Sequence, residues 1–360
     1  MGKMEMNKPI HKNKASVAIL MAILAAALYG ISSPVSKLLL VKIPPTLMAA
    51  LLYLGAGFGM LTVIIYKIIN KNERLEAKMT KKEFPYIIGM IVLDIAAPIF
   101  LMLGLTMTTA GNASLLNNFE IVATSLIALF VFKEAIGRRM WIAISLITLS
   151  SIILSVQDFS SLSFSIGSIF VIAACLGWGL ENNCTRMLSL KDPLQIVVVK
   201  GFGSGIGSLI ISLALKEYCS DLLYISVALI LGFVAYGLSI YFYIKAQREL
   251  GAARTSAYYA AAPFIGVMIS WLVFQETITT SFVIALIVML IGTYFAITEK
   301  HRHSHLHLET THEHKHNHDD GHHNHKHDLE VLGEHSHEHA HEEIDHKHSH
   351  TPDLHHRHPH

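Results

Sequence analysis

The stretch GAARTSAYYAAAPFIGVMISWLVFQE, residues Gly251–Glu276, decides the fold of this chain. It is a run of small and apolar residues with a proline in its middle and a glutamate at its end. An earlier stretch, GNASLLNNFEIVATSLIALFVFKE at Gly111–Glu134, repeats it at an offset of 142, so that Glu134 falls on Glu276. A repeat of this length indicates that one structural unit occurs twice.

The repetition continues outward from this stretch over most of the chain. YGISSPVSK at Tyr29–Lys37 matches WGLENNCTR at Trp178–Arg186 at an offset of 149, with glycine on glycine and a basic residue on a basic residue. Pro45 likewise falls on Pro193. The predicted organisation is an N-terminal segment (1–15), a first repeat (16–157), a second repeat (165–299) and a polar tail (300–360).

The composition indicates an all-α membrane protein. Apolar residues make up 52% of the chain and charged residues only 15%, whereas soluble domains carry about 25% charged residues. A membrane-spanning helix needs about 20 mostly apolar residues, and the apolar runs separated by short loops predict ten such helices. The predicted spans are 16–39, 45–69, 84–104, 109–132, 139–157, 165–188, 194–215, 222–244, 252–274 and 279–298.

The distribution of Lys and Arg predicts the orientation in the plasma membrane. With the N-terminus in the cytoplasm, the inner segments before residue 301 hold 20 basic residues and the outer segments hold 3, namely Lys37, Lys42 and Lys216. This bias follows the positive-inside rule and places both termini in the cytoplasm. Because each repeat has five helices, the second repeat enters the membrane from the opposite side, as in many secondary transporters.

Three carboxylates inside predicted spans are the first candidates for function. A charge at the centre of a membrane helix costs about 2.5–3.5 kcal/mol on insertion scales, and such residues usually face the interior of the bundle. The functional interpretation is substrate binding or proton coupling, and the structural one is a hydrogen-bonded contact between helices. The candidate substrate-binding residues are Asp94, Glu120 and Glu181, the neighbouring Asn117, Asn182 and Asn183, and Tyr258, which could instead be an interface anchor.

Other polar and helix-breaking residues have simpler interpretations. Glu134 and Glu276 end their spans, where a carboxylate can reach the interface, so we expect a structural role for them. Pro34, Pro98 and Pro263 lie inside spans, where they free backbone carbonyls and can bend helices around a cavity. We also expect these helices to contain no enzyme active site, because no nucleophile with a base and no metal triad is visible.

The glycines of GFGSGIG, residues 201–207, predict close helix packing. They form two interleaved GxxxG pairs, Gly201 with Gly205 and Gly203 with Gly207. Such pairs let helix backbones approach closely in a membrane. The segment lacks the Lys-Ser/Thr that ends a phosphate-binding loop, so transport would draw on a gradient or run downhill.

The paired Gly-centred segments, LLNNFE, GAARTSAYYAAAP and the closing glutamates together resemble the drug/metabolite transporter superfamily, and within it the EamA-type transporters. The resemblance covers about residues 16–299 and implies a ten-helix carrier of two inverted five-helix units. Members move small metabolites, often exporting amino acids, through a central cavity. The sequence departs from the family pattern at three places. Tyr29 stands where the family commonly has a tryptophan, and Leu52 stands where a basic residue is frequent, which the second copy keeps as Lys200. The asparagines after Glu181 are not a general feature of the family.

Residues 301–360 of the tail have a different composition, with 23 of the 24 histidines of the chain, 5 Lys and Arg residues and 12 acidic residues. The lack of apolar residues predicts disorder. Imidazole is a good ligand for zinc, nickel and cobalt, so the tail is predicted to bind divalent metal ions. The candidate ligands are His301, His303, His305, His307, His312, His314, His316, His318, His335, His337, His339 and His341.

Three functions are compatible with these features. The first is an exporter of a small metabolite such as an amino acid, with an appended metal-binding tail. The second is a transporter of nickel, cobalt or zinc whose tail collects or senses metal, although the spans contain no histidine. The third is a membrane-anchored metal store. The expected partners are the bilayer, a small-molecule substrate and divalent metal ions, and a homodimer is compatible with the sequence. We expect no required cofactor and no nucleic-acid partner.

Overall fold

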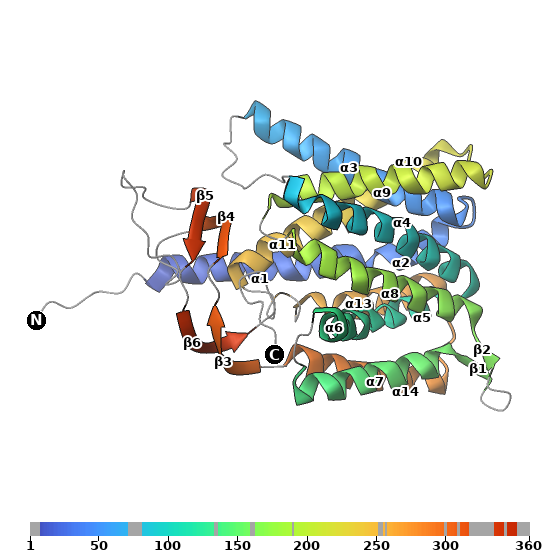
Figure 1. Cartoon of the computed structure of the whole chain (residues 1–360). Helices are drawn as coiled ribbons and strands as arrows, with labels where there is room; N and C mark the ends of the chain where they lie inside the picture. The colour runs from blue at the N-terminus through green and yellow to red at the C-terminus, as the bar shows by residue number, and fades with distance from the viewer. Residues whose placement is uncertain are drawn as a thin grey trace, which may run out of the picture.

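The computed structural model describes most of the membrane part of the chain and four segments of the tail. Figure 1 shows long helices running side by side, with the beginning of α1 and the strands that follow α14 at the same end of the bundle. The described residues are 8–70, 81–132, 136–158, 163–188, 191–250, 255, 258–298, 301–307, 310–316, 335–341 and 344–350. The side chains of 8–15, 132, 157–158, 163, 186, 247–250 and of the tail lie outside the description.

The first half of the chain consists of helices that differ in length. Prolines stand at or next to the first position of α3 and α4, where the missing N–H removes no helical hydrogen bond. The elements are α1 (Lys8–Gly30), α2 (Ser32–Leu39), α3 (Pro45–Ile69), η1 (Lys81–Glu83), α4 (Phe84–Met107), α5 (Ala110–Leu116), α6 (Phe119–Phe132) and α7 (Arg138–Ser155).

The second half follows a short strand pair, β1 (Val156–Asp158) with β2 (Ser163–Phe164). Side chains cap the starts of its helices: Asp192 accepts from the N–H of Leu194, and Asp221 accepts from that of Leu223, as N-cap carboxylates do. The helices are α8 (Ile166–Arg186), α9 (Pro193–Ala214), α10 (Leu222–Leu231), a π-helical η2 (Gly232–Leu238), α11 (Ser239–Leu250), α13 (Ala262–Phe274) and α14 (Thr280–Ile297).

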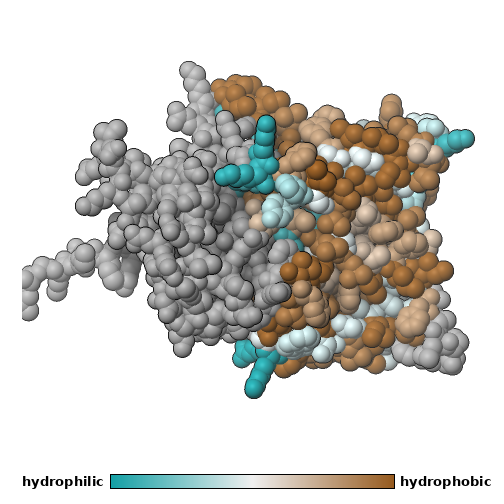
Figure 2. Space-filling model, viewed as in Figure 1, coloured by the Kyte–Doolittle hydropathy of each residue, from teal (hydrophilic) through white to brown (hydrophobic). Residues whose placement is uncertain are grey.

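The surface of the bundle is apolar, as a membrane protein requires. Figure 2 shows apolar side chains covering most of the visible face, with hydrophilic groups toward its edges. Within the described residues, eight helical stretches are long and apolar enough to cross a membrane, so the chain is a multi-pass membrane protein. They are Ser16–Leu39, Pro45–Ile69, Lys81–Met107, Ala110–Val131, Arg138–Ser155, Pro193–Ala214, Leu222–Ala246 and Thr280–Ile297.

The two remaining predicted spans need separate mention. The span 165–188 is the helix α8, whose last two turns carry a run of polar residues and which is not among the eight apolar stretches. The span 252–274 is described as the short apolar helix α13, while most of residues 251–257 lie outside the described part of the chain. The count of ten spans and their arrangement as inverted repeats therefore stay predictions.

Three helical segments are interrupted inside the bundle. A turn at Ile31 separates α1 from α2, a turn at Asn117 and Asn118 separates α5 from α6, and a turn at residues 260–261 precedes α13. Pro34 and Pro263 lie just after two of these turns, whereas Pro98 stays inside the continuous α4. The expected interruption of the helix is thus seen next to Pro34 and Pro263, but not at Pro98.

The GxxxG pairs pack as predicted, each against a different helix. A Cβ atom on Gly201 would lie 2.5 Å from the backbone nitrogen of Gly57 on α3, and one on Gly205 would meet Leu54 of the same helix. Gly203 and Gly207 instead face the side chains of two isoleucines on α4. These glycines allow α9 to approach both neighbours.

The tail contains regular structure in its described segments, so the prediction of a wholly disordered tail is not confirmed. Strand β3 (His301–His307) pairs antiparallel with β6 (Ile344–His350), and β4 (Thr310–His316) pairs antiparallel with β5 (His335–His341). Tail residues 308–309, 317–334, 342–343 and 351–360, with candidate ligand His318 among them, lie outside the described part.

Candidate functional site

Lys200 of α9 lies between two carboxylates in the middle of the bundle. Its Nζ is 3.0 Å from Oδ2 of Asp94 and 2.9 Å from Oε1 of Glu181. We call these three residues the ion triad; their exposed fractions are 8%, 0% and 2% for Lys200, Asp94 and Glu181. Tyr53 donates a hydrogen bond of 2.8 Å to Oδ1 of Asp94, and Thr185 donates one to Glu181.

The ion triad joins three helices. Asp94 comes from α4, Glu181 from α8 and Lys200 from α9. Lys200 directly precedes Gly201, whose close contact with α3 draws that part of α9 into the bundle. Lys200 is the only cation among the described residues that pairs with Asp94. Two carboxylates share one ammonium group, so the ion triad keeps one excess negative charge when all three residues are ionised.

Lys200 is the functional candidate that sequence reasoning missed. The topology prediction counted it among basic residues on the cytoplasmic side, which is wrong, because it is buried inside α9. The inner segments therefore hold 19 of the basic residues instead of 20. A usable signal was present: a lysine seven residues into an apolar helix needs a buried partner.

Glu120 lies in a second polar cluster that adjoins the ion triad through α8. Asn182 donates a hydrogen bond of 2.6 Å to Oε1 of Glu120 and one of 3.2 Å to Thr124, which joins α8 to α6. Asn183 donates to the carbonyls of Gly179 at 2.8 Å and Thr124 at 3.4 Å. Five of the predicted residues thus gather along α8: Asp94, Glu120, Glu181, Asn182 and Asn183.

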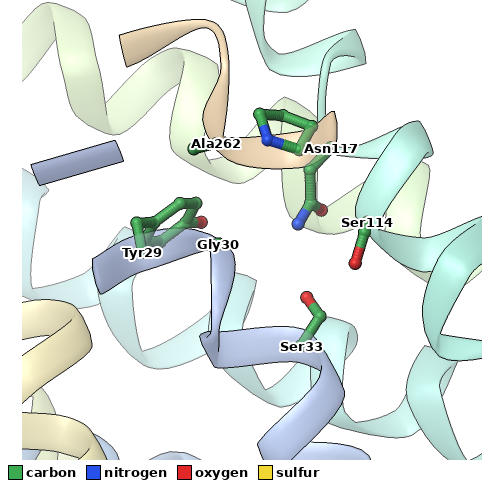
Figure 3. Close-up of a pocket in the computed structure, with 7 residues that line it drawn as sticks. Tyr29, Gly30, Ser33, Ser114, Asn117 and Ala262 are labelled. Carbon is green, nitrogen blue, oxygen red and sulfur yellow. The ribbon is translucent and has the colours of Figure 1, made fainter. Parts of the chain in front are cut away.

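Asn117 lines a small cavity at the helix interruptions (Figure 3). The cavity has room for about one water molecule, and it is bordered by segments from both halves of the chain. We call it the polar cavity; it is lined by Tyr29, Gly30, Ser33, Ser114, Asn117, Ala262 and Pro263.

Tyrosine rings connect the polar cavity with the ion triad. The ring of Tyr29 lies 5.8 Å from Tyr259 and 5.9 Å from Tyr236, and Tyr236 lies 5.4 Å from Tyr53, the hydrogen-bond donor of Asp94. These tyrosines form a largely buried aromatic path through the bundle. The predicted Tyr258 is half-buried, and the ring contacts of the described residues involve its neighbour Tyr259.

Glu276 has the structural role expected for it. Its carboxylate accepts hydrogen bonds from the N–H groups of Ala110 at 2.9 Å and Gly111 at 3.1 Å, at the start of α5. Lys37 nearby donates to the carbonyls of Leu105 and Thr108 at the end of α4. A carboxylate at a helix N-terminus satisfies free N–H groups and interacts favourably with the helix dipole. The matching Glu134 lies outside the described residues.

Two ion pairs occupy matching positions in the two repeats. Lys42, before α3, lies 2.6 Å from Asp221, which caps α10. Lys191, before α9, lies 3.5 Å from Glu83, which precedes α4. The hydrogen bond from Lys42 lowers the pKa of Asp221, and the same bond raises the pKa of Lys42. Each pair joins the start of one helix to a helix of the other half.

Comparisons with known proteins agree with this architecture. The model of the EamA-like transporter family matches the chain twice, over residues 16–156 and 165–298. A protein of Methanothermobacter thermautotrophicus described as an uncharacterized transporter is 27% identical over 290 residues, covering 76% of this chain and 83% of that protein. One solved crystal structure has the same fold, with a TM-score of 0.58 and 14% identity over 78% of this chain and 95% of that one. The chain belongs to the EamA-like transporter family.

Proposed function

We propose that this protein is a secondary transporter that exports a small metabolite such as an amino acid by alternating access. The observation that carries the proposal is the ion triad, a lysine and two carboxylates buried where helices of the two halves meet. Buried charges are costly in a membrane and mark substrate and ion pathways. On this proposal the protein catalyses no chemical reaction and needs no resident cofactor.

The charges of the ion triad suit a zwitterionic substrate. The carboxylate of an amino acid would take the place of Asp94 or Glu181 at the Lys200 ammonium, and its own ammonium group would pair with the released side chain. Because the substrate carries both charges, each buried group keeps a partner, which avoids the penalty of an unpaired buried ion. Asn182, which follows Glu181 in α8, and its hydrogen-bond partner Glu120 supply further hydrogen-bonding groups.

The proposed architecture is a carrier of ten spans in two inverted five-helix units. Helix packing supports it: α3 and α7 each pack against the matching helix of the other half (α9 and α14), and α4 packs on α8 as α11 packs on α1. The matched ion pairs Lys42–Asp221 and Lys191–Glu83 have the same symmetry. The basic-residue bias supports a plasma-membrane protein with both termini in the cytoplasm.

We propose that the tail binds zinc, nickel or cobalt in the cytoplasm. The strand registers place histidine opposite histidine, for example His303 opposite His348 and His314 opposite His337. Directly opposite residues of an antiparallel pair lie about 4.5–5.5 Å apart, a spacing at which two imidazoles can share an ion. Interspersed acidic residues offset the charge of the metal.

The tail also supports a second candidate function, transport of a divalent metal such as nickel, cobalt or zinc. Its membrane site would have to use the carboxylates Asp94, Glu120 and Glu181. The position of Lys200 between two of them argues against this, because a fixed cation repels a metal ion at the same place. Among the side chains that the structure describes, no group of three His, Cys, Asp or Glu is arranged to hold a metal.

A single transport screen separates the two candidates. Cells with and without the protein are loaded with a panel of amino acids and divalent metals, and export and tolerance are measured. We expect faster export of one or a few amino-acid-like metabolites. Metal export without any metabolite export would support the metal transporter instead, and no change in either would contradict both.

The tail is tested with the full-length protein and a variant that ends at residue 300. Nickel and zinc binding are titrated at pH 7.5 and pH 5.5, and metabolite export is measured for both proteins. We expect several moderate sites on the full chain at pH 7.5 and much weaker binding at pH 5.5, since free histidine titrates near pH 6.5. Equal binding by the truncated protein would contradict metal binding by the tail.

A further inference from the structure

The polar cavity lies where three helical segments of the bundle are interrupted. The turns are at Ile31, at Asn117 and Asn118, and at residues 260–261. The second and third occur within one residue of matching positions in the two repeats, given the offset of 142. Interrupted helices at matching positions supply free backbone groups to the ion and substrate sites of transporters.

Two side-chain oxygens in the polar cavity lack the partners that buried polar atoms normally have. Neither Oδ1 of Asn117 nor Oγ of Ser114 has a hydrogen-bond partner among the described residues. These residues are only 8% and 2% exposed. Figure 3 shows the hydroxyls of Ser114 and Ser33 directed toward one another across the cavity, with the amide of Asn117 beside them. Unpaired buried polar atoms are rare and need a ligand, an ion or a water molecule.

Backbone carbonyls add to this set of oxygens. Pro34 has no N–H, so the carbonyl of Gly30, four residues earlier, cannot receive its usual helical hydrogen bond. Gly30 and Gly266 approach closely: a Cβ on Gly266 would lie 3.0 Å from the Gly30 oxygen, and a Cβ on Gly30 would lie 2.7 Å from the Ala262 oxygen. Both carbonyls therefore lie at the contact between α1 and α13 that borders the cavity.

The size and chemistry of the polar cavity select its ligand. Space for about one water molecule excludes an amino acid. The available donors are neutral oxygens of hydroxyl, amide and carbonyl groups, which are ligands for hard cations. The C-terminal ends of α1 and α5 point to the same place, and helix C-termini carry partial negative charge. Glu120, one turn after Asn117, supplies a full negative charge nearby.

We propose that the polar cavity binds one sodium ion, held by Ser33, Ser114, Asn117 and backbone carbonyls of the interrupted helices. The site lies between α1, α5 and α13, which belong to different repeats, so the ion would favour a state in which these helices are together. The proposal extends the proposed function by naming the coupling ion: sodium enters down its gradient while the metabolite leaves.

Sodium binding is measured on the purified full-length protein in detergent by thermal unfolding. Sodium chloride replaces choline chloride at constant ionic strength, and potassium chloride serves as a second series. We expect the unfolding temperature to rise with sodium and to saturate, by about 3 °C at ten times the dissociation constant, with little change in potassium. The variant Ser114→Ala and the variant Asn117→Ala should lose this rise.

Ser208→Ala is the matched control. Ser208 is also a buried serine whose hydroxyl has no partner among the described residues, but it lies on α9 and does not line the cavity. This variant should keep the sodium-dependent rise. Absence of the rise in the unmodified protein, as expected for a site that holds only water, would overturn the proposal, and so would a full rise in Ser114→Ala.

The sodium site and the transport function can fail separately. Sodium-dependent stabilisation without export of any tested metabolite would leave the site in place and contradict the proposed function. Export that continues at an unchanged rate without sodium, together with no stabilisation, would leave the function in place and overturn the site.

Discussion

At the scale of single residues, the chemistry of this protein centres on Lys200 between Asp94 and Glu181. The sequence predicted the two carboxylates, because acidic residues stand out in apolar spans. It did not predict their partner, since spacing along one helix does not say which other helix a side chain meets. A lysine near the start of the predicted span 194–215 was therefore assigned to the cytoplasmic side, whereas the structure buries it.

Replacing Lys200→Met tests whether the ion triad is a paired unit. The change removes the only described cation beside Asp94, and breaking a buried ion pair by removing one partner costs about 3–5 kcal/mol. We expect lower thermal stability in detergent and loss of transport. Adding Asp94→Asn and Glu181→Gln to the same protein should restore much of the stability, because no unpaired charge remains.

If Lys200→Met keeps the stability and the transport rate of the unmodified protein, the pairing of the ion triad is contradicted. Lys216→Met, which removes an exposed lysine at the end of α9, is the control and should change neither stability nor transport. If the triple variant is less stable than Lys200→Met, the three side chains do not act as a charge-balanced set.

A second residue-scale prediction concerns Glu276. The variant Glu276→Gln weakens the hydrogen bonds to the N–H groups of Ala110 and Gly111 and removes a charge from the start of α5. Losing a capping group costs about 0.5–2 kcal/mol, so we expect a modest fall in unfolding temperature with transport retained. A large loss of transport at unchanged stability would show that this residue does more than cap a helix.

At the scale of elements, close packing of α9 places the charged site. Gly201 and Gly205 face α3, while Gly203 and Gly207 face α4. The GxxxG spacing in the sequence predicted this packing correctly because the rule depends only on residue size. The sequence also indicated that prolines would free carbonyls, but it did not show that the interruptions near Pro34 and Pro263 meet at one cavity, since that depends on tertiary contacts.

Gly201→Ala and Gly203→Ala form a matched pair for this packing. The new methyl group at residue 201 would lie 2.5 Å from the backbone nitrogen of Gly57, which cannot move without separating α9 from α3. At residue 203 it would meet the end of the Ile91 side chain, which can rotate away. We expect Gly201→Ala to lower stability and transport clearly and Gly203→Ala to have a smaller effect; equal effects would contradict the packing.

The exposed ion pair Lys42–Asp221 gives a prediction about pH. The pKa of Asp221 is lowered on folding, so its contribution is present above the unfolded value near 3.9 and is lost as the pH falls further. The pKa of Lys42 is raised, so its contribution is lost only as the pH rises beyond about 10.4. Lys42→Met should therefore change the unfolding temperature slightly and by equal amounts at pH 5 and pH 8. A difference between these two pH values would contradict the assignment.

At the scale of the whole molecule, the sequence predicted most of the helices of the membrane part. The described apolar runs, the GNAS stretch and the acidic residues Asp94, Glu120 and Glu181 lie in helices that pack together. The tail was less predictable, because its composition argued for disorder and its described segments pair as strands. Local composition does not determine which distant strands pair.

The membrane topology can be tested on intact cells. With a small epitope at the end of the tail and a single reporter cysteine in the segment joining α9 to α10, we expect the cysteine to react with an impermeant reagent added outside. The epitope should be detected only after permeabilisation. Detection of the epitope on intact cells would refute the cytoplasmic placement of the tail.

Transport by purified protein in sealed liposomes tests the role of the buried charges most directly. Exchange of labelled for unlabelled substrate is measured for the unmodified protein, Glu120→Gln and Glu181→Gln. The control variant is Glu217→Gln; Glu217 follows α9, and its carboxylate accepts a hydrogen bond from the N–H of Leu47 near the start of α3. We expect rapid exchange of an amino-acid-like metabolite by the unmodified and control proteins and at least tenfold slower exchange by the other two, all inserted equally. Full-rate exchange by both Glu120→Gln and Glu181→Gln would contradict the proposed site.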